Sequence, residues 1–162
     1  MRIKDLLSAD DVVLDLNAGS KRNLLQILSA EAASRLGRPE QEVMGALQVR
    51  EQLGSTALGG GVALPHAQIS GNSPPVMLFA RLRRPIDFGA RDDEPIDLVF
   101  LVLWPEASPE GLLAALSEIC RTLRDPQVLR RLRVAQSPGD MVALLHQAGA
   151  SAADAGAAPG AE

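Results

Sequence analysis

The chain has 162 residues, of which 46% are hydrophobic and 22% are charged, and this composition is typical of a globular protein with one domain and a proper core. Its net charge of −4 argues against nucleic acid or an anionic membrane as the main partner, and an aromatic content of 2% argues against a base-stacking surface. With Cys120 as its one cysteine, the chain can form neither an internal disulfide nor a cysteine-based metal site.

The apolar runs of the chain indicate its compartment. The first residues carry charges throughout and lack the apolar core of a secretory signal. The longest strongly apolar run, residues 98–104, is far too short to span a bilayer. We therefore expect a soluble cytoplasmic protein that does not insert into a membrane.

The first third of the chain alternates strand and helix patterns. Residues 12–16 predict a strand, and Ser20 is placed to cap a helix whose apolar spacing continues to residue 36. Gly37 is expected to end that helix, because glycine readily adopts the left-handed backbone of a helix C-terminus. A second helix is predicted for residues 39–52.

The rest of the chain continues this mixture. Alternating side chains predict a strand at residues 76–83, and a run that is apolar on both faces predicts a central strand at 98–104. Helix starts are expected at residues 108–110, 125–126 and 137–140, and the last helix is expected to end near Gly149. The pattern predicts a single α/β or α+β domain over residues 1–149.

The final residues differ from the rest in composition. Residues 150–162 are rich in alanine and glycine and show no periodicity, so we expect a disordered tail.

His66 is the strongest candidate for chemistry. It follows Pro65 at the end of the short apolar run 62–64, and small Ala67 leaves room beside its ring. A histidine at a strand end has a nucleophilic ring nitrogen that a large partner can reach, which suits covalent catalysis or phosphoryl carriage. On the motif alone a structural histidine remains the alternative, since a lone histidine near apolar residues more often has that role.

Arg50 is a candidate clamp for phosphate or carboxylate. It lies seven positions after Val43, on the apolar face of the second helix, where an unpaired guanidinium is costly. Its planar fork can bind two oxygens of an anion. An ion pair with a carboxylate such as that of Glu51 is the alternative.

The segment between Arg50 and His66 offers further contacts. Backbone amides at Gly60 and Gly61 could cradle an anion, or the glycines could only form a tight turn. The hydroxyls of Ser55 and Thr56 could bind a phosphate or the imidazole, or they could stabilise a turn. Since no Lys-Ser/Thr pair follows the glycines, we do not expect ATP binding.

Other charged residues are expected to lie at the surface. His146 is placed near the end of the last helix, where a cation suits the helix dipole. The arginines of residues 130–133 are expected to form a solvated helix face, with docking of an acidic partner as the alternative. The acidic loop 92–94 is interpreted as a solubility feature, with a catalytic carboxylate pair as the less favoured alternative. Two distant histidines without cysteine partners argue against a zinc site.

Residues 50–67, REQLGSTALGGGVALPHA, resemble the active-site signature of fructose/mannitol-type enzyme IIA domains of the bacterial phosphotransferase system. The Gly54-Ser55-Thr56 element, the segment 130–137 and the free-standing length are most similar to the nitrogen-regulatory branch. This resemblance covers residues 3–148. It implies an α/β fold with a mixed central β-sheet flanked by helices. It also implies that His66 accepts a phosphoryl group from a histidine-containing phosphocarrier protein and that Arg50 stabilises the phosphate.

The resemblance implies a phosphotransferase component that acts mainly as a regulator. Its phosphorylation state would set which targets it binds, such as components of potassium transport or sensing, and no metal or cofactor is expected. Many relatives carry a second histidine where our alignment places Leu112, which cannot support a phosphohistidine by hydrogen bonding. An interaction module without phosphotransfer is therefore an alternative. A sugar-specific phosphocarrier is a further alternative, which the absence of an attached transporter domain disfavours.

Overall fold

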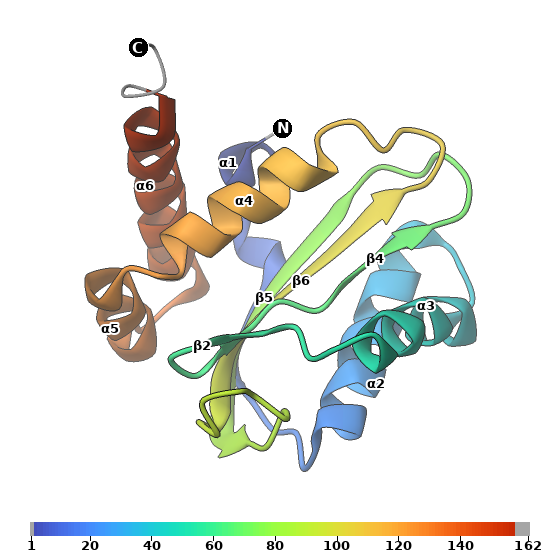
Figure 1. The fold of residues 1–162 in the computed structure, drawn as a ribbon, viewed down its shortest axis with the longest axis horizontal. Coiled ribbons are helices and arrows are strands. Elements are labelled where there is room, and N and C mark those ends of the chain that lie inside the picture. The colour runs from blue at the N-terminus through green and yellow to red at the C-terminus, as the bar shows by residue number, and fades with distance from the viewer. Residues whose placement is uncertain (1, 158–162) are drawn as a thin grey trace. The chain divides into compact units, whose positions relative to one another are not determined.

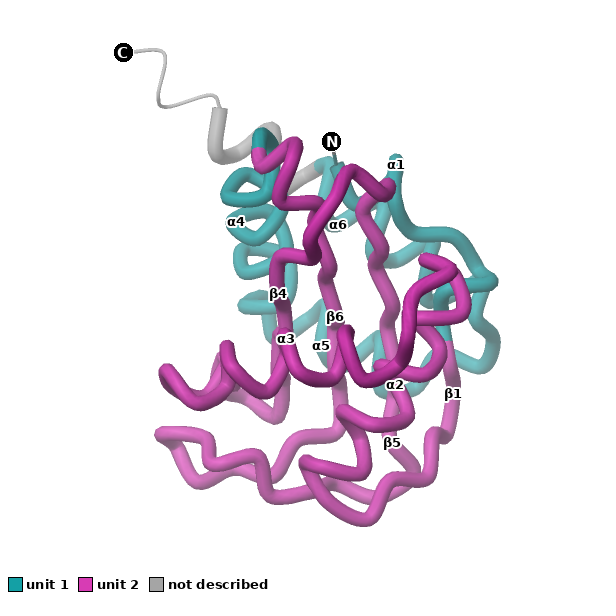
Figure 2. The backbone as a smooth tube through the Cα atoms, turned by 90° about the vertical axis from the view of Figure 1, so that its right-hand side faces the viewer, with its two compact units in different colours: residues 1–12, 110–162 teal, residues 13–109 magenta. Residues whose placement is uncertain are grey.

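The computed structural model describes residues 2–157, and the chain divides into two compact units. Unit 2 is the continuous stretch Val13–Pro109, and unit 1 combines Met1–Val12 with Glu110–Glu162 (Figure 2). The strands and the first two long helices fall in unit 2, whereas unit 1 is built from helices.

A mixed six-stranded sheet forms the centre of unit 2 and confirms the predicted fold class. Its strand order is β1-β5-β6-β3-β2, with β4 also pairing with β6. β5 is antiparallel to β6, while β3 and β4 are both parallel to β6. The strands are β1 (Val12–Leu16), β2 (Ala57–Gly59), β3 (Val62–Ala63), β4 (His66–Ile69), β5 (Val76–Ile86) and β6 (Ile96–Pro105).

Helices α2 (Lys21–Leu36) and α3 (Glu40–Gln52) pack together against one face of this sheet (Figure 1). The Ser20 hydroxyl accepts a hydrogen bond from the backbone N–H of Asn23, and Gly37 ends α2 with a φ of 65°, so both predicted ends are confirmed. The apolar stripes of the two helices and the facing strand residues form one continuous core.

The long strands β5 and β6 show why the sheet is stable. Leu78 and Ala80 of β5 point into the core with α2 and α3, as the alternation predicts. Met77 and Phe79, on the opposite face of β5, are also buried, and the Phe79 ring lies 5.5 Å from that of Phe100 on β6. β6 is buried from Leu98 to its end, which explains the uninterrupted apolar run 98–104.

Unit 1 consists of α1 (Ile3–Leu6), a 3₁₀ turn η1 (Ala9–Asp11), α4 (Leu112–Thr122), α5 (Pro126–Val134) and α6 (Pro138–Ala157). The N-terminal segment is tied to these helices by polar contacts. The buried Glu118 carboxylate accepts the backbone N–H of Ile3, and a ring nitrogen of His146 lies 2.8 Å from the Leu7 carbonyl oxygen. His146 is therefore half-buried and bonded, which corrects its interpretation as a plain surface residue.

Two helix boundaries differ from the predictions. Helix α4 begins at Leu112 rather than at Ser108, because the left-handed backbone of Gly111 (φ 92°) sets its start. Ser108 instead accepts the indole N–H of Trp104 at its carbonyl. Helix α6 continues past Gly149 to Ala157, so residues 150–157 are helical, and the remainder of the predicted disordered tail lies outside the described residues.

Candidate phosphoryl-accepting site

His66 is the first residue of β4, at the point where that strand joins β6. The backbone carbonyl of Pro65 accepts the N–H of Val102, and His66 is then in register with Val102. Proline donates no hydrogen bond, so it suits the position just before the strand. The chain therefore places the imidazole at a strand start, where it is half-buried rather than enclosed in the core.

The ring of His66 is oriented by its own backbone. Its Nδ1 atom lies 2.8 Å from the carbonyl oxygen of Leu64. Because a carbonyl can only accept, we assign the ring proton to Nδ1, which leaves a lone pair on Nε2. Burial lowers the pKa of His66 below its ordinary value, and the charge of Arg50 lowers that pKa further, against opposing effects of the Leu64 carbonyl and Glu51. The neutral, nucleophilic form is thus favoured near pH 7.

Arg50 lies in the last turn of α3 and its charge acts on the His66 imidazole. Its Nη1 donates to the carbonyl of Gly54 at 3.1 Å, which uses one of the five N–H donors of the guanidinium. The expected alternative of an ion pair with Glu51 is not what the structure contains, since Glu51 pairs with Lys21. The structure thus brings Arg50 and His66 into one electrostatic environment.

Glu51 organises the turn after α3 and was missed as a functional residue by sequence reasoning. Its side chain is only 7% exposed and binds the Lys21 ammonium at 2.8 Å. The same carboxylate accepts both the backbone N–H and the hydroxyl of Thr56. Lys21 also lies over the Phe88 ring, 4.2 Å from its centroid. In the sequence, only its position next to Arg50 draws attention to Glu51. Its partner Lys21 lies on α2, thirty positions earlier, so the local sequence does not indicate the ion pair.

The two hydroxyls that sequence reasoning singled out make local hydrogen bonds. Ser55 Oγ donates to the carbonyl of Phe88 at 3.1 Å and accepts the N–H of Ala57. Thr56 donates to Glu51. These contacts correspond to the turn-stabilising alternative, and contacts of either hydroxyl with phosphate stay a prediction.

The glycine turn lies away from His66. Gly60 donates its N–H to the Asp92 carboxylate at 3.1 Å, and the hydrogen bonds that this carboxylate accepts from the backbone N–H groups of Glu94 and Gly60 keep the pKa of Asp92 below its usual value. β3 starts opposite Leu98 of β6, whereas His66 lies opposite Val102. Four residues of strand separate these positions by about 13 Å. The structure therefore does not bring Gly60 and Gly61 to the imidazole.

Leu112 belongs to unit 1, where it is the half-buried first residue of α4. Its place as the substitute for a second histidine stays an expectation from the resemblance. Among the residues whose side chains the structure describes, no group of three or more histidine, cysteine or acidic side chains could hold a metal ion. No helix among the same residues is long and apolar enough to cross a membrane.

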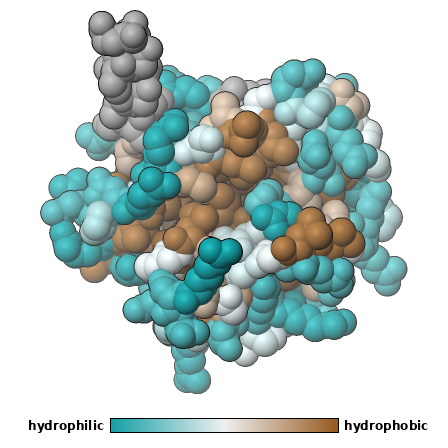
Figure 3. Space-filling model, viewed as in Figure 1, coloured by the Kyte–Doolittle hydropathy of each residue, from teal (hydrophilic) through white to brown (hydrophobic). Residues whose placement is uncertain are grey.

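An apolar patch on α3 lies beside Arg50 in the sequence and on the surface. Val49 is 61% exposed and Leu53 is 81% exposed, and their spacing of four residues puts them on one side of the helix end. Figure 3 shows hydrophobic side chains at the surface over α3. Large apolar side chains left in solvent next to a charged guanidinium are suited to protein contact.

Comparison with known proteins agrees with this geometry. Residues 5–148 match the family described as phosphoenolpyruvate-dependent sugar phosphotransferase system, EIIA 2, and the match spans both compact units. A nitrogen regulatory protein of Bradyrhizobium diazoefficiens is 41% identical over 153 residues, which cover 94% of this chain and 100% of that protein.

Solved structures show the same fold. The crystal structure of nitrogen regulatory protein IIA-Ntr from Neisseria meningitidis matches with a TM-score of 0.84 and 31% identity, over 88% of this chain and 98% of that one. Enzyme IIA mannitol of Escherichia coli, solved by NMR in complex with phosphorylated enzyme IIB mannitol, matches with a TM-score of 0.72 and 20% identity, over 87% of this chain and 97% of that one. The chain therefore belongs to the EIIA type 2 family of the phosphotransferase system.

Proposed function

We propose that Nε2 of His66 accepts a phosphoryl group from a phosphohistidine carrier protein and that the phosphorylation state of the chain controls which proteins it binds. The observation that carries this proposal is the hydrogen bond from Nδ1 to the Leu64 carbonyl, because it places the ring proton on Nδ1 and leaves Nε2 with a lone pair for attack. The lowered pKa of His66 supports it, since an unprotonated ring is needed for attack.

The transfer is an in-line displacement between two imidazoles. The Nε2 lone pair of His66 forms the new N–P bond while the N–P bond of the donor phosphohistidine breaks. The donor imidazole keeps that electron pair and leaves neutral when its other ring nitrogen carries a proton. The positive charge that develops on the His66 ring is stabilised by the Nδ1–H bond to Leu64. No metal ion takes part in this step.

Arg50 would stabilise the phosphoryl group in transit. Its charge already acts on His66, and its donors beyond the one that binds Gly54 suit the spread negative charge of a transferring phosphoryl group. The same charge is unfavourable for a protonated His66, so it helps to keep the acceptor neutral. Arg50 thus contributes both to the acceptor state and to the transition state.

The apolar side chains beside Arg50 support transfer between proteins. Val49 and Leu53 provide an exposed patch on which a carrier could dock with its phosphohistidine close to the guanidinium. The mannitol relative was solved with a phosphorylated partner protein, which is the kind of encounter this patch suits. Relatives that are named nitrogen regulatory proteins support a regulatory role. We propose that this role is exerted in the cytoplasm, on targets such as components of potassium transport or sensing.

The experiment is an intact-mass measurement after incubation with a phosphorylated histidine phosphocarrier. We expect the wild-type protein to gain one phosphoryl group that is lost in acid, as a phosphoramidate is. His66→Ala should gain none, whereas His146→Gln, which changes the other histidine, should gain one as the wild type does. Phosphorylation of His66→Ala would contradict the proposed acceptor.

An interaction module without phosphotransfer is the second candidate, and the leucine at position 112 favours it. Under that function, the affinity for a partner protein is the same whether or not the carrier is phosphorylated, both for the wild type and for Leu112→His. Under the proposed function, binding of a target differs between the phosphorylated and unphosphorylated protein. The resemblance implies that Leu112→His restores the second active-site histidine of many relatives, so this variant should slow the spontaneous loss of the phosphoryl group.

A further inference from the structure

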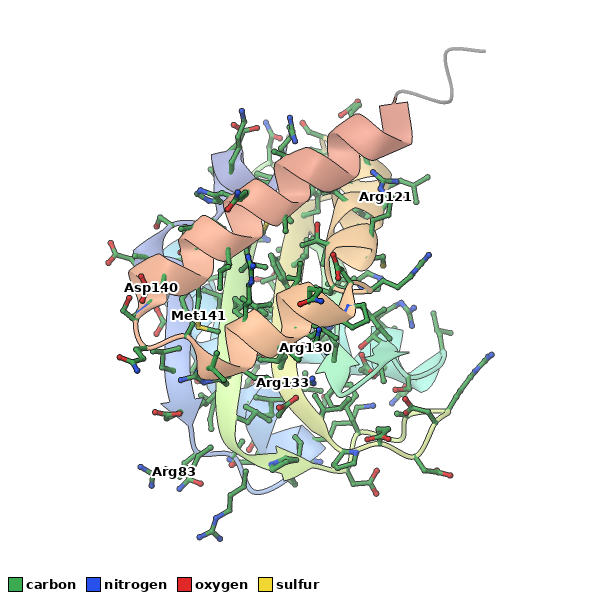
Figure 4. All side chains as sticks on the ribbon, turned by 90° about the vertical axis from the view of Figure 1, so that its left-hand side faces the viewer. Arg83, Arg121, Arg130, Arg133, Asp140 and Met141 are labelled. Carbon is green, nitrogen blue, oxygen red and sulfur yellow. The ribbon has the colours of Figure 1, made fainter. Side chains whose placement is uncertain are left out.

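The C-terminal part of unit 1 carries a basic segment in an otherwise acidic protein. Between residues 121 and 134 the sequence has five arginines against one acidic residue, while the whole chain has a net charge of −4. The acidic residue, Asp125, is used as the cap of α5, where it accepts the N–H of Gln127. Arg130 and Arg131 are both exposed on α5. Figure 4 shows Arg130 and Arg133 projecting from this helix.

A hollow with apolar lining lies between α5 and the start of α6. Its volume is about 400 Å³. The apolar lining comes from Val134, Ala135, Ala143 and Leu144, and the polar lining comes from Arg131, Asp140 and Gln147. Val134 is 74% exposed although it is a large apolar residue at the end of a helix. The hollow thus combines an uncovered apolar floor with a basic edge on α5.

We propose that this hollow is a docking site for an amphipathic helix of a partner protein that carries acidic residues beside its apolar stripe. The apolar side chains of such a helix, spaced three or four residues apart, would cover Val134 and enter the hollow. Its acidic residues would lie along the α5 edge, opposite Arg130 and Arg131, where they gain charge complementarity. This surface belongs to unit 1. The proposal does not rest on the phosphorylation proposed for His66.

The composition of the hollow favours a helix over nucleic acid. A phosphate backbone would be attracted to the arginines, but it would leave Val134 and Leu144 uncovered and would be repelled by the Asp140 carboxylate that lines the same hollow. The negative charge of Asp140 also determines how the partner helix is oriented in the hollow. The acidic side of the partner helix should face α5, and the side that faces α6 should be neutral or basic.

The test is selection from a displayed library of helix-forming peptides against the wild-type protein at physiological salt. We expect enrichment of peptides with apolar residues at i, i+3 or i+4, and i+7 and with Glu or Asp on one flank. The enriched peptide should shift the NMR amide signals of Ala143 and Leu144. Val134→Asp and Arg131→Glu should each weaken its binding at least about tenfold.

Arg83→Glu is the matched control, because Arg83 is an exposed arginine on β5 in unit 2. It should leave peptide affinity unchanged, and all three variants should keep the wild-type far-UV circular dichroism and phosphoryl acceptance at His66. The proposal is overturned if no peptide is enriched, if the enriched peptides bind Val134→Asp as tightly as wild type, or if a random-sequence DNA duplex binds α5 in place of the peptides. If the wild-type protein binds the peptide but accepts no phosphoryl group, only the proposed function is contradicted.

Discussion

The imidazole of His66 is held by the backbone of its own strand, with Nδ1 placed 2.8 Å from the Leu64 carbonyl oxygen. A backbone acceptor cannot change its protonation state, so it fixes the ring tautomer at every pH at which the ring is neutral. The ring nitrogen that we propose to react is therefore determined by the fold around Leu64 and Pro65 and does not depend on a second side chain. This arrangement suits a protein in which leucine occupies position 112.

The tautomer makes the first prediction. In ¹⁵N NMR spectra of the unphosphorylated protein at neutral pH, Nδ1 of His66 should show the chemical shift of a protonated ring nitrogen and Nε2 that of an unprotonated one. After phosphoryl transfer, the coupling to phosphorus should be found at Nε2. Phosphorus bound at Nδ1 would contradict this assignment, because that atom is engaged with Leu64.

The second prediction concerns the titration of His66. Burial and Arg50 lower its pKa, so its NMR titration midpoint should lie below the ordinary value of 6.5. Arg50→Gln removes a neighbouring positive charge and should move the midpoint upward. A downward shift in that variant would show that Arg50 does not act on the imidazole through its charge. Arg83→Gln, which changes an exposed arginine of β5, is the control and should leave the midpoint unchanged.

The same pKa sets a pH dependence of stability and of phosphoryl acceptance. Since the folded-state pKa is lowered, the unfolded chain binds the His66 proton more readily between the folded pKa and about 6.5. The neutral ring therefore contributes to the free energy of unfolding above about pH 6.5, and this contribution is lost as the pH falls from about 6.5 to the folded-state pKa. The rate of phosphoryl acceptance should fall at still lower pH, through the folded pKa. A rate that already halves at 6.5 or above would contradict the lowered pKa.

Features set by neighbouring residues could be predicted from the sequence. The Ser20 cap and the Gly37 stop of α2 depend on short hydrogen bonds and one backbone conformation. The start of α4 was predicted wrongly because Ser108 and Pro109 have the residue types of a helix start, whereas the left-handed Gly111 sets the boundary. The end of α6 was predicted too early, since Gly149 remains helical and the alanines that follow favour helix.

Features set by sheet register and by distant charges could not be predicted. Gly61 and His66 are close in sequence, but the parallel pairing of β3 and β4 along β6 places them well apart. The partner of Glu51 is Lys21 on α2, and nothing in the local sequence indicates that pair. The sequence thus singles out His66 and Arg50 as candidates, but it does not reveal the residues that hold the turn between them.

The third prediction tests the Lys21–Glu51 pair. Lys21→Met leaves the nearly buried Glu51 carboxylate without its cation and should lower the free energy of unfolding by about 1–3 kcal/mol, less than for a fully buried pair because Lys21 is 28% exposed. The measurement is urea denaturation at pH 7. Glu31→Gln, which removes the charge of the exposed i,i+4 partner of Arg35, should cost at most about 0.5 kcal/mol. Equal losses in the two variants would show that the Lys21 pair has no special role.

The fourth prediction compares two helical glycines. A Cβ at position 149 would lie 2.6 Å from Glu118 Oε2, and that buried carboxylate cannot move freely because it accepts the N–H of Ile3. Gly149→Ala should therefore lower the free energy of unfolding by about 1–3 kcal/mol despite the helix propensity of alanine. A Cβ at position 45 in α3 would have no atom within 4 Å, so Gly45→Ala should raise the free energy of unfolding by up to about 1 kcal/mol. Urea denaturation measures both changes. A stabilised Gly149→Ala protein would show that Glu118 does not hold the N-terminal segment rigidly against α4 and α6.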